Sequence, residues 1–281
     1  MRWYRLRNVA VTAAILVALP GVWGWSIGAQ QALVLYDNFD NPNIDPERWI
    51  GQDVGSGAQT DRLEQVREIR ANKLRLASRI YGESLFTGGS KNGGSRIFFQ
   101  NPSVRVMEAD FRVTQVEATA CAPLEVGALT RGVLQGLFFN AGADVPPPND
   151  RTDEVGAGIQ IGRRSNSLDP PDVLRANAFV FQCTNAACTT STSLNRIALG
   201  TVAVNEKVRL RLEWDEANSQ FVYQFGKNDP AFLNYALPVR PSVINNRIIE
   251  VSNSVPNCGG GVRSLASMEL HVDDVYVNAG P

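Results

Sequence analysis

The sequence predicts an all-β fold, a two-sheet antiparallel jelly-roll β-sandwich with little helix. Apolar and polar residues alternate along most of the chain after residue 30, and a two-residue period is typical of strands with one buried face. Long stretches with a helical period are absent, and only residues 61–69 are expected to form a turn or two of helix. So many short strands in one domain, residues 30–281, favour two packed sheets.

The first 29 residues are expected to be a secretory signal peptide. Three arginines precede an apolar stretch over residues 9–19, a Pro-Gly pair ends it, and small residues follow up to Ala29. This three-part pattern is typical of a cleaved leader. The run is shorter than the ~20 residues that span a bilayer. If residues 22–27 are included, an uncleaved N-terminal anchor is the alternative. No later segment is expected to cross a membrane.

The expected strands follow one another from residue 68 onward. The first two, within residues 68–78, form a hairpin about a turn at Asn72. Along residues 103–113 the alternation changes phase near Met107, which predicts a β-bulge. Further strands are expected over residues 134–140, 155–161, 178–183, 207–215, 220–225 and 267–277.

The strand expected over residues 207–215 has the clearest pattern. Its apolar residues lie on one side and its charged residues on the other, the apolar set being Val208, Leu210, Leu212 and Trp214. Residues 215–219 then turn the chain into an aromatic strand. The segment therefore predicts a hairpin with one buried face and one solvated face.

Four cysteines agree with export to an oxidising compartment. They allow three pairings. Cys183 and Cys188 flank a tight turn, so a bond between them would staple a hairpin, and Cys121 would then pair with Cys258. A thiolate metal site needs closely paired cysteines with further partners, so disulfides are the favoured interpretation.

The charge balance excludes a nucleic-acid-binding surface. The chain has 27 Lys and Arg against 28 Asp and Glu, so no basic field exists to hold phosphates. The single histidine, His271, excludes multi-histidine metal sites. Any Ser-His-Asp or Cys-His mechanism would have to use that residue. Phosphate-binding glycine loops and the HExxH and GxSxG motifs are absent from the sequence.

Several segments, taken in order, resemble the concanavalin A-like lectin and glucanase superfamily. That superfamily includes laminin-G-like modules and laminarinase-type glucanases. The matching segments are an acidic-aromatic opening at residues 35–40, an Asp-Pro-x-x-Trp segment at residues 45–49, the hairpin containing Trp214, and a closing strand at residues 272–277. The resemblance covers most of residues 33–278 and implies a jelly roll.

In the glucanase branch, catalysis depends on carboxylates two residues apart along one strand, since such residues share a face. The nearest match here is Glu108 and Asp110, with Arg112 in place of a third carboxylate. Arg105 and Arg112 would keep these acids ionised, which opposes a role as general acid. A charge-paired, solvated face is the favoured interpretation, so the laminarinase-type catalytic set is expected to be missing.

Glu269, His271 and Asp273 alternate on one face of the last strand. Such a trio would suit acid–base chemistry. The resemblance, however, implies that this strand lies away from the sugar-binding groove. An exposed polar face is the favoured interpretation.

The resemblance also suggests a structural calcium ion, since in many relatives the aspartate of the closing strand ligates one. Asp273 matches that position, and Asp37, Asn38 and Asp40 near the chain start are possible partners. Calcium takes six to eight oxygen ligands, so backbone carbonyls near Asn72 would have to contribute.

Sugar binding in such proteins uses aromatic faces beside amides and carboxylates. The candidates are Tyr81, Phe86 and Phe99, with Trp49 and Phe98 as further possibilities. Alternation predicts that most aromatic residues lie in the core. In the adjacent pairs at residues 98–99 and 138–139, one ring is expected to point inward and the other outward.

These observations favour a secreted or periplasmic module that binds a polysaccharide or a cell-surface glycan, and no cofactor other than calcium is expected. A polysaccharide-cleaving hydrolase or lyase with displaced carboxylates is the first alternative. A structural or interaction protein of the cell envelope with a protein partner is the second. Fold alone does not separate these, because function depends on the site.

Overall fold

Fifteen strands and no helix make up the part of the chain that the structure, a computed structural model, describes: residues 32–55, 63–85, 87–121, 127–142, 149–242, 244 and 246–278. Residues Gln31–Pro281 form one compact unit. No helix in the described residues is long and apolar enough to cross a membrane. The leader predicted at residues 1–29 and the role predicted for Phe86 lie outside the described residues.

The strands form two antiparallel sheets. The eight-stranded sheet has the order β13-β12-β11-β6-β15-β4-β3, and β1 also pairs with β15. Its strands are β1 (Leu33–Asp37), β3 (Leu63–Ile69), β4 (Leu74–Tyr81), β6 (Val106–Thr119), β11 (Lys207–Asp215), β12 (Gln220–Phe225), β13 (Ala231–Asn234) and β15 (Leu265–Asn278).

The seven-stranded sheet has the order β10-β9-β8-β7-β14-β5-β2. Its strands are β2 (Trp49–Gly55), β5 (Thr87–Phe99), β7 (Leu129–Asn140), β8 (Glu154–Arg164), β9 (Val173–Cys183), β10 (Ser191–Ala203) and β14 (Arg247–Cys258). In both sheets, strands far apart in sequence lie side by side, as β6 and β15 do in one and β7 and β14 in the other. The predicted jelly-roll sandwich is therefore confirmed.

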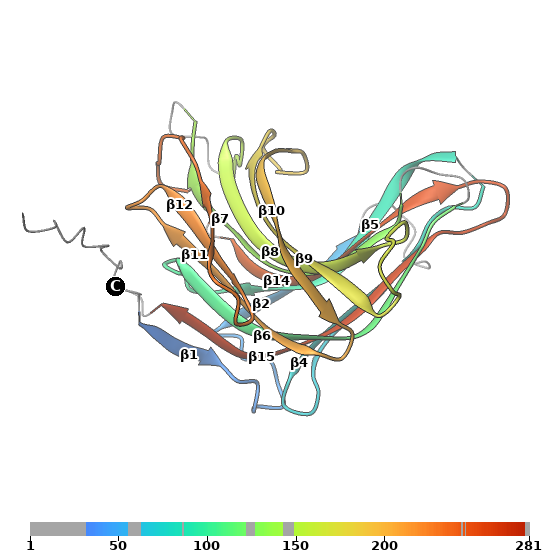
Figure 1. The fold of residues 1–281 in the computed structure, drawn as a ribbon, viewed down its shortest axis with the longest axis horizontal. Helices are drawn as coiled ribbons and strands as arrows, with labels where there is room; N and C mark the ends of the chain where they lie inside the picture. Colours follow the sequence, from blue (N-terminus) through green and yellow to red (C-terminus); the bar gives the residue numbers. More distant parts are fainter. Residues whose placement is uncertain are drawn as a thin grey trace, which may run out of the picture. The chain divides into compact units, whose positions relative to one another are not determined.

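A large hydrophobic core lies between the sheets, with a smaller second cluster that includes Ile80 and Val255. Alternate residues of the eight-stranded sheet, such as Phe111 and Leu212, meet alternate residues of the other sheet, such as Leu134 and Ile159, and all four are fully buried. Figure 1 shows the two sheets as curved layers, with β6 and β15 beneath β8, β9 and β14. Because the layers curve, the outer face of the seven-stranded sheet, which points away from the other sheet, is hollowed (Figure 1). We call it the concave face.

The hairpin predicted from residues 207–225 is confirmed. Strand β11 pairs with β12, and the predicted apolar face is buried in the core, with Val208 at 7% exposure and Trp214 at 8%. The turn predicted at Asn72 is also found. Ala71 and Asn72 both have positive φ, 51° and 56°, which a tight turn between two strands requires.

Two local predictions are wrong. Residues 61–69 were expected to be helical. The described part of this segment, Leu63–Ile69, is strand β3, because it pairs along its length with β4. The expected bulge near Met107 is not in β6, whose pairing with β11 is regular. The irregularity is on the partner strand β15 between Asp273 and Tyr276, where Asp274 has a φ of 45°.

Both predicted disulfides are present. Cys183 and Cys188 close the end of β9, with Cα atoms 4.9 Å apart. Cys121 and Cys258 are 5.3 Å apart by Cα and 137 residues apart in sequence. The second bond joins the chain just after β6 to the end of β14, so it crosslinks the two sheets.

We expect the Cys121–Cys258 bond to contribute more to stability than the Cys183–Cys188 bond. Loop-closure entropy predicts about 5 kcal/mol for the long loop and about 2 kcal/mol for the short one. Urea unfolding of the double serine variants C121S/C258S and C183S/C188S checks this. Equal losses, or a larger loss for the short loop, would contradict the expectation.

Candidate functional site

The pairing of neighbouring strands in the seven-stranded sheet aligns side chains in rows across the concave face. Each row contains one side chain from each strand. Along β8, Val155, Ala157 and Ile159 are fully buried in the core. The residues between them, Gly156 and Gly158, therefore face the concave side, because successive side chains alternate across a sheet.

The first row is mostly apolar. Phe179 of β9 lies opposite Gly158 of β8 on one side and opposite Arg196 of β10 on the other. The pairing continues through the remaining strands of the sheet to Gln135, Ile248, Phe98 and Ile50. Ile50 is 52% exposed, so this row presents apolar surface to solvent.

Two phenylalanine rings lie across the backbone of β8. A Cβ atom built on Gly158 would lie 2.5 Å from Cζ of Phe179, and one on Gly156 would lie 2.3 Å from Cζ of Phe181. The two rings have centroids 6.0 Å apart, and both residues are part-exposed. The glycines leave room for the rings, so the rings form a low apolar platform on the concave face.

The second row is polar and lies beside this platform. It runs across the sheet from Asn177 through Gln160, Val133, Glu250 and Arg96 to Gln52. Glu250 accepts a hydrogen bond from Gln135 at 3.3 Å and pairs with Arg96 at 3.2 Å. Amide and guanidinium donors are thus held beside the aromatic rings.

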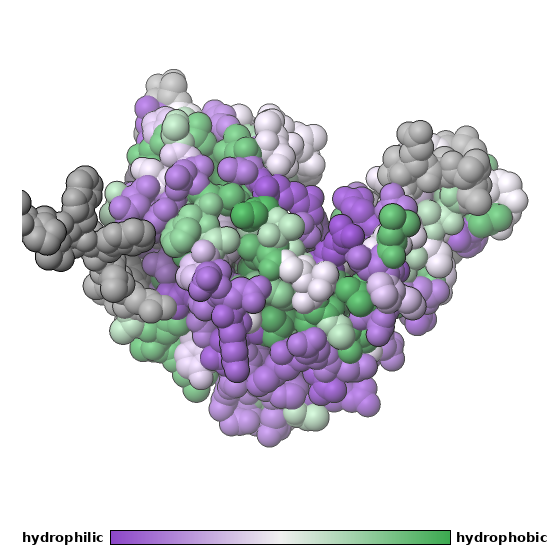
Figure 2. All heavy atoms as spheres, in the orientation of Figure 1, coloured by the Kyte–Doolittle hydropathy of each residue, from purple (hydrophilic) through white to green (hydrophobic). Residues whose placement is uncertain are grey.

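A pocket of about 420 Å³ continues the polar row toward the ends of β8 and β9. Its lining includes Gln160, Asn177, Arg164, Arg175 and Arg196. Figure 2 shows the surface dipping between two raised ends of the molecule, with both hydrophobic and hydrophilic residues around the dip. Platform and pocket together form the candidate site, which we call the concave site.

The carboxylates on this face are too far apart to act on one glycosidic bond. Among the described strand residues of this face, Glu154 and Glu250 carry them. Glu154 is on β8, and Glu250 lies in the row of Gln160 of the same strand, through Val133 of β7. Six residues along β8, of ~3.4 Å each, separate these two rows by about 20 Å. The paired carboxylates of glycoside hydrolases are about 5–9.5 Å apart.

The predicted catalytic candidates lie on the opposite side of the molecule, on the outer face of the eight-stranded sheet. Asp110 is 4% exposed and binds Nε of Arg209 at 2.6 Å and Nζ of Lys207 at 2.9 Å. Burial alone would raise the pKa of Asp110, but these hydrogen bonds lower it below its ordinary value. Glu108 pairs with Arg209 and Arg211. The face is charge-paired as predicted, but its cations are Lys207, Arg209 and Arg211 rather than the predicted Arg105 and Arg112. Arg105 pairs with Glu216 instead, and Asp110 is buried rather than solvated.

Glu269 and His271 lie on the same outer face. His271 contacts Oε1 of Glu269 at 3.0 Å, and Arg75 pairs with Glu269 at 2.7 Å. Burial alone would raise the pKa of Glu269, but hydrogen bonds from Arg75, Thr114 and His271 lower it to about 2. Glu269 is therefore a stable anion within an ion-pair network.

The predicted calcium ligands are held by other partners. Asp273 pairs with Lys73. Asp37 accepts hydrogen bonds from Nε1 of Trp49 at 2.7 Å and from the amide of Phe39 at 2.8 Å, and Asp40 accepts one from Asn38. Within the described residues, no group of three or more His, Cys, Asp or Glu side chains could hold a metal ion. Calcium also takes backbone and amide carbonyl oxygens, so a calcium ion at these residues stays a prediction.

The predicted aromatic candidates do not form a platform. Phe99 is 4% exposed and packs against Trp49 in the core, while its neighbour Phe98 lies on the concave face, so one ring of this pair points inward as expected. Tyr81 ends β4, whose alternate residues Leu74, Leu76, Ser78 and Ile80 are buried. Tyr81 therefore lies on the outer face of the other sheet.

The second aromatic pair behaves differently. Phe138 and Phe139 are both buried in the core, at 3% and 0% exposure, and the expectation of one outward ring is wrong. The pairing of β7 with β8 shifts between Leu137 and Phe139. Because a bulge inserts an extra residue, two consecutive side chains point to the same side.

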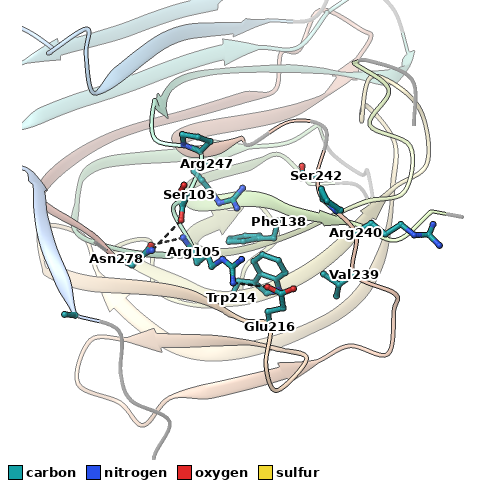
Figure 3. A pocket seen from close by; sticks show the side chains of 13 residues that line it. Ser103, Arg105, Phe138, Trp214, Glu216, Val239, Arg240, Ser242, Arg247 and Asn278 are labelled. Atoms are coloured by element: carbon teal, nitrogen blue, oxygen red, sulfur yellow. Dashed lines mark hydrogen bonds and ion pairs between the residues drawn. The ribbon is translucent and has the colours of Figure 1, made fainter. Parts of the chain in front are cut away.

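A larger pocket of about 750 Å³ lies at one end of the core (Figure 3) and is lined by Phe138, Trp214 and Arg247 among others. Arg247 is 2% exposed. It donates to the carbonyls of Val104, at 2.8 Å, and Leu137, and its guanidinium lies 3.9 Å from the Phe138 ring centroid. Burial lowers the pKa of Arg247 to about 9. These contacts make Arg247 a structural link between the sheets.

Phe179, Phe181 and the glycines of β8 were not among the residues singled out from sequence. The alternation Phe179-x-Phe181 and the alternation Gly156-x-Gly158 are both visible in the sequence. Each alone is ordinary in a strand. Only the pairing of β8 with β9 shows that the rings and the glycines lie opposite each other.

No family model matches the chain, and no curated protein matches it. Among solved structures, the β-glucanase of Bacillus licheniformis is similar, with 10% identity and a TM-score of 0.43 over 90% of this chain and 99% of that one. A glycoside hydrolase family 16 endo-glucanase of Bacteroides ovatus shows 12% identity and a TM-score of 0.43 over 84% and 98%. The lectin UEA-II, complexed with galactose, shows 10% identity and a TM-score of 0.34 over 86% and 98%.

These likenesses are too distant to carry an argument about function. The two-sheet jelly-roll sandwich expected from the sequence is established by the strand order of the chain itself.

We expect Glu269→Gln to remove part of the acid sensitivity of the fold. The folded pKa of about 2 lies below the ordinary value of 4.5. The charged form therefore stabilises the fold above pH 4.5, and this contribution is lost as the pH falls toward 2. Between pH 6 and pH 2.5 the wild type should lose about 1–2 kcal/mol more than the variant.

Urea unfolding across this pH range measures the difference. Glu64→Gln, at an exposed pair with Arg79, is the matched control and should follow the wild type. Parallel pH profiles for Glu269→Gln and the wild type would refute the assignment.

We expect Arg247→Met to destabilise the fold by about 2–4 kcal/mol, because two buried carbonyl groups lose their donor. Urea unfolding measures the loss. Arg70→Met, at an exposed turn, should change stability by less than about 0.5 kcal/mol. A loss at Arg247 no larger than that of the control would show that the link is dispensable.

Proposed function

We propose that the chain is an exported polysaccharide-binding module and that the concave site holds the sugar chain. The observation that carries the proposal is the pair of part-exposed rings, Phe179 and Phe181, lying 6.0 Å apart over the glycines of β8. Neighbouring flat rings offer stacking surfaces to successive sugar units. Binding sites combine such apolar surface with a few well-placed polar groups.

The two rows together supply those groups. Gln135 of the first row and Asn177 of the polar row are part-exposed and present amide donors and acceptors beside the rings. Gln160 is buried at 5% exposure, where Arg131 donates to its Oε1 at 2.9 Å. Sugar hydroxyls both donate and accept hydrogen bonds. A row of amides along an apolar platform therefore suits a chain of hydroxylated rings.

The arrangement of carboxylates supports binding rather than cleavage. Glu154 is fully buried and accepts a hydrogen bond from Ser242 at 2.6 Å. Glu250 is paired with Arg96. With about 20 Å between them, neither has, among the described strand residues of this face, a second carboxylate at the spacing that glycoside hydrolysis uses.

Export is supported by the covalent structure. Two disulfides use all four cysteines, and disulfides persist in oxidising compartments. The leader-like residues 1–29 point the same way. We propose that the mature protein is secreted or periplasmic.

We expect Phe179→Ala and Phe181→Ala each to weaken polysaccharide binding at least tenfold, about 1.4 kcal/mol, because each removes a stacking surface. A polysaccharide array followed by titration of the bound polymer measures this. Phe232→Ala is the matched control, since Phe232 is 54% exposed on the other sheet, and it should bind as the wild type does.

Two results would contradict the proposal. The folded wild type could bind no polysaccharide, which would favour a protein partner in the envelope. Alternatively, it could bind one that the Phe179 and Phe181 variants bind equally well, which would place the site elsewhere.

A further inference from the structure

We infer that the polysaccharide held in the concave site is acidic, and that Arg164 and Arg196 bind its carboxylate or sulfate groups. This inference rests on the proposed function and specifies its ligand. The pocket of about 420 Å³ beside the platform is lined by four arginines, and its lining contains no aspartate or glutamate.

The four arginines differ in whether they have hydrogen-bond or ion-pair partners within the protein. Arg163 donates to the carbonyls of Pro170, Val173 and Asp169, so it anchors the loop beside the pocket. Arg175 forms an ion pair with Asp169. These two side chains have partners within the protein.

Arg164 and Arg196 form no ion pair with any described residue, and both are exposed. They come from β8 and from the edge strand β10, on either side of β9. A guanidinium group binds carboxylates and sulfate-like anions through parallel N–H donors. Two such groups facing one pocket form a site for an anion.

Arg131, which is outside the pocket lining, adds to the positive charge near Arg164 and Arg196. Arg131 is part-buried, and its Nε atom has no hydrogen-bond partner among the described residues. Burial lowers the pKa of Arg131; Glu250 opposes this, and the charges of Arg196 and Arg164 add to it. The positive charges of Arg164 and Arg196, which line one pocket, therefore act on Arg131 as well.

This local charge contrasts with the chain as a whole, whose formal net charge is −1. Like charges held together in a partly enclosed site repel one another unless counter-charge is present. A bound anion would relieve that repulsion. A general attraction to polyanions does not explain the feature, because the chain as a whole is not basic.

The position of Arg196 joins this pocket to the platform. Arg196 lies directly opposite Phe179 in the pairing of β10 with β9, and paired residues of antiparallel strands have neighbouring side chains. A sugar stacked on Phe179 would place a charged substituent at its edge within reach of Arg196. The same row would therefore bind both the sugar ring, through Phe179, and the charged substituent on that sugar, through Arg196.

The test compares acidic polymers with their uncharged counterparts. Isothermal titration of the full chain would use polygalacturonate and alginate, each against its carboxyl-reduced form, and dextran sulfate against dextran. We expect at least tenfold tighter binding to one acidic polymer than to its uncharged form. The carboxylate and sulfate arms identify which anion is recognised.

The double variant Arg164→Gln/Arg196→Gln should lose that preference and bind both forms as the wild type binds the uncharged one. The matched control is Arg70→Gln/Arg263→Gln, which removes the same charge at two exposed turns and should keep the preference. A control that loses as much would show a net-charge effect and overturn the inference.

The remaining outcomes separate this inference from the proposed function. Equal binding to charged and uncharged forms, lost in Phe179→Ala, would overturn the acidic ligand and leave the polysaccharide-binding site standing. Absence of binding to every polymer tested would count against both.

Discussion

Hydrogen-bonded register in the seven-stranded sheet is the constraint on which the concave site depends. The pairing places Arg196, Phe179, Gly158 and Gln135 in one row, and Asn177, Gln160 and Glu250 in the next. A slip of one residue would move every side chain of a strand to the other face. The buried residues of β8, such as Ile159, oppose such a slip, so the core that stabilises the fold also positions the site.

The glycines of β8 connect packing with function. Glycine inside a strand weakens it, because it loses more chain entropy on folding and packs no side chain. Gly156 and Gly158 lie in the middle of a sheet, where the rings of Phe181 and Phe179 occupy the space a Cβ would fill. The rings pack against the backbone at the two glycines and shield it from solvent, and this contact holds the rings flat on the sheet. The outer face of the other sheet contrasts with this, since Glu108, Asp110 and Glu269 are engaged in ion pairs there.

Much of the fold could be predicted from the sequence. Alternation reports burial directly, as in strand β11, and the short spacing of Cys183 and Cys188 across a turn indicates one disulfide and leaves the other pair. Strand β10 gave no such signal, since almost all of its residues are exposed, and the two inward rings at residues 138–139 depend on a bulge that no local pattern indicates. The concave site could not be predicted for a related reason. Its residues come from different strands, and the pattern within one strand does not indicate which strands are its neighbours.

A crystal structure of the protein with an oligosaccharide of uronic acid tests the central claim most directly. The account predicts sugar rings over Phe179 and Phe181, with a carboxylate bound by Arg196 or Arg164. Sugar bound instead in the end pocket beside Trp214, or on the outer face beside Asp110, would contradict it.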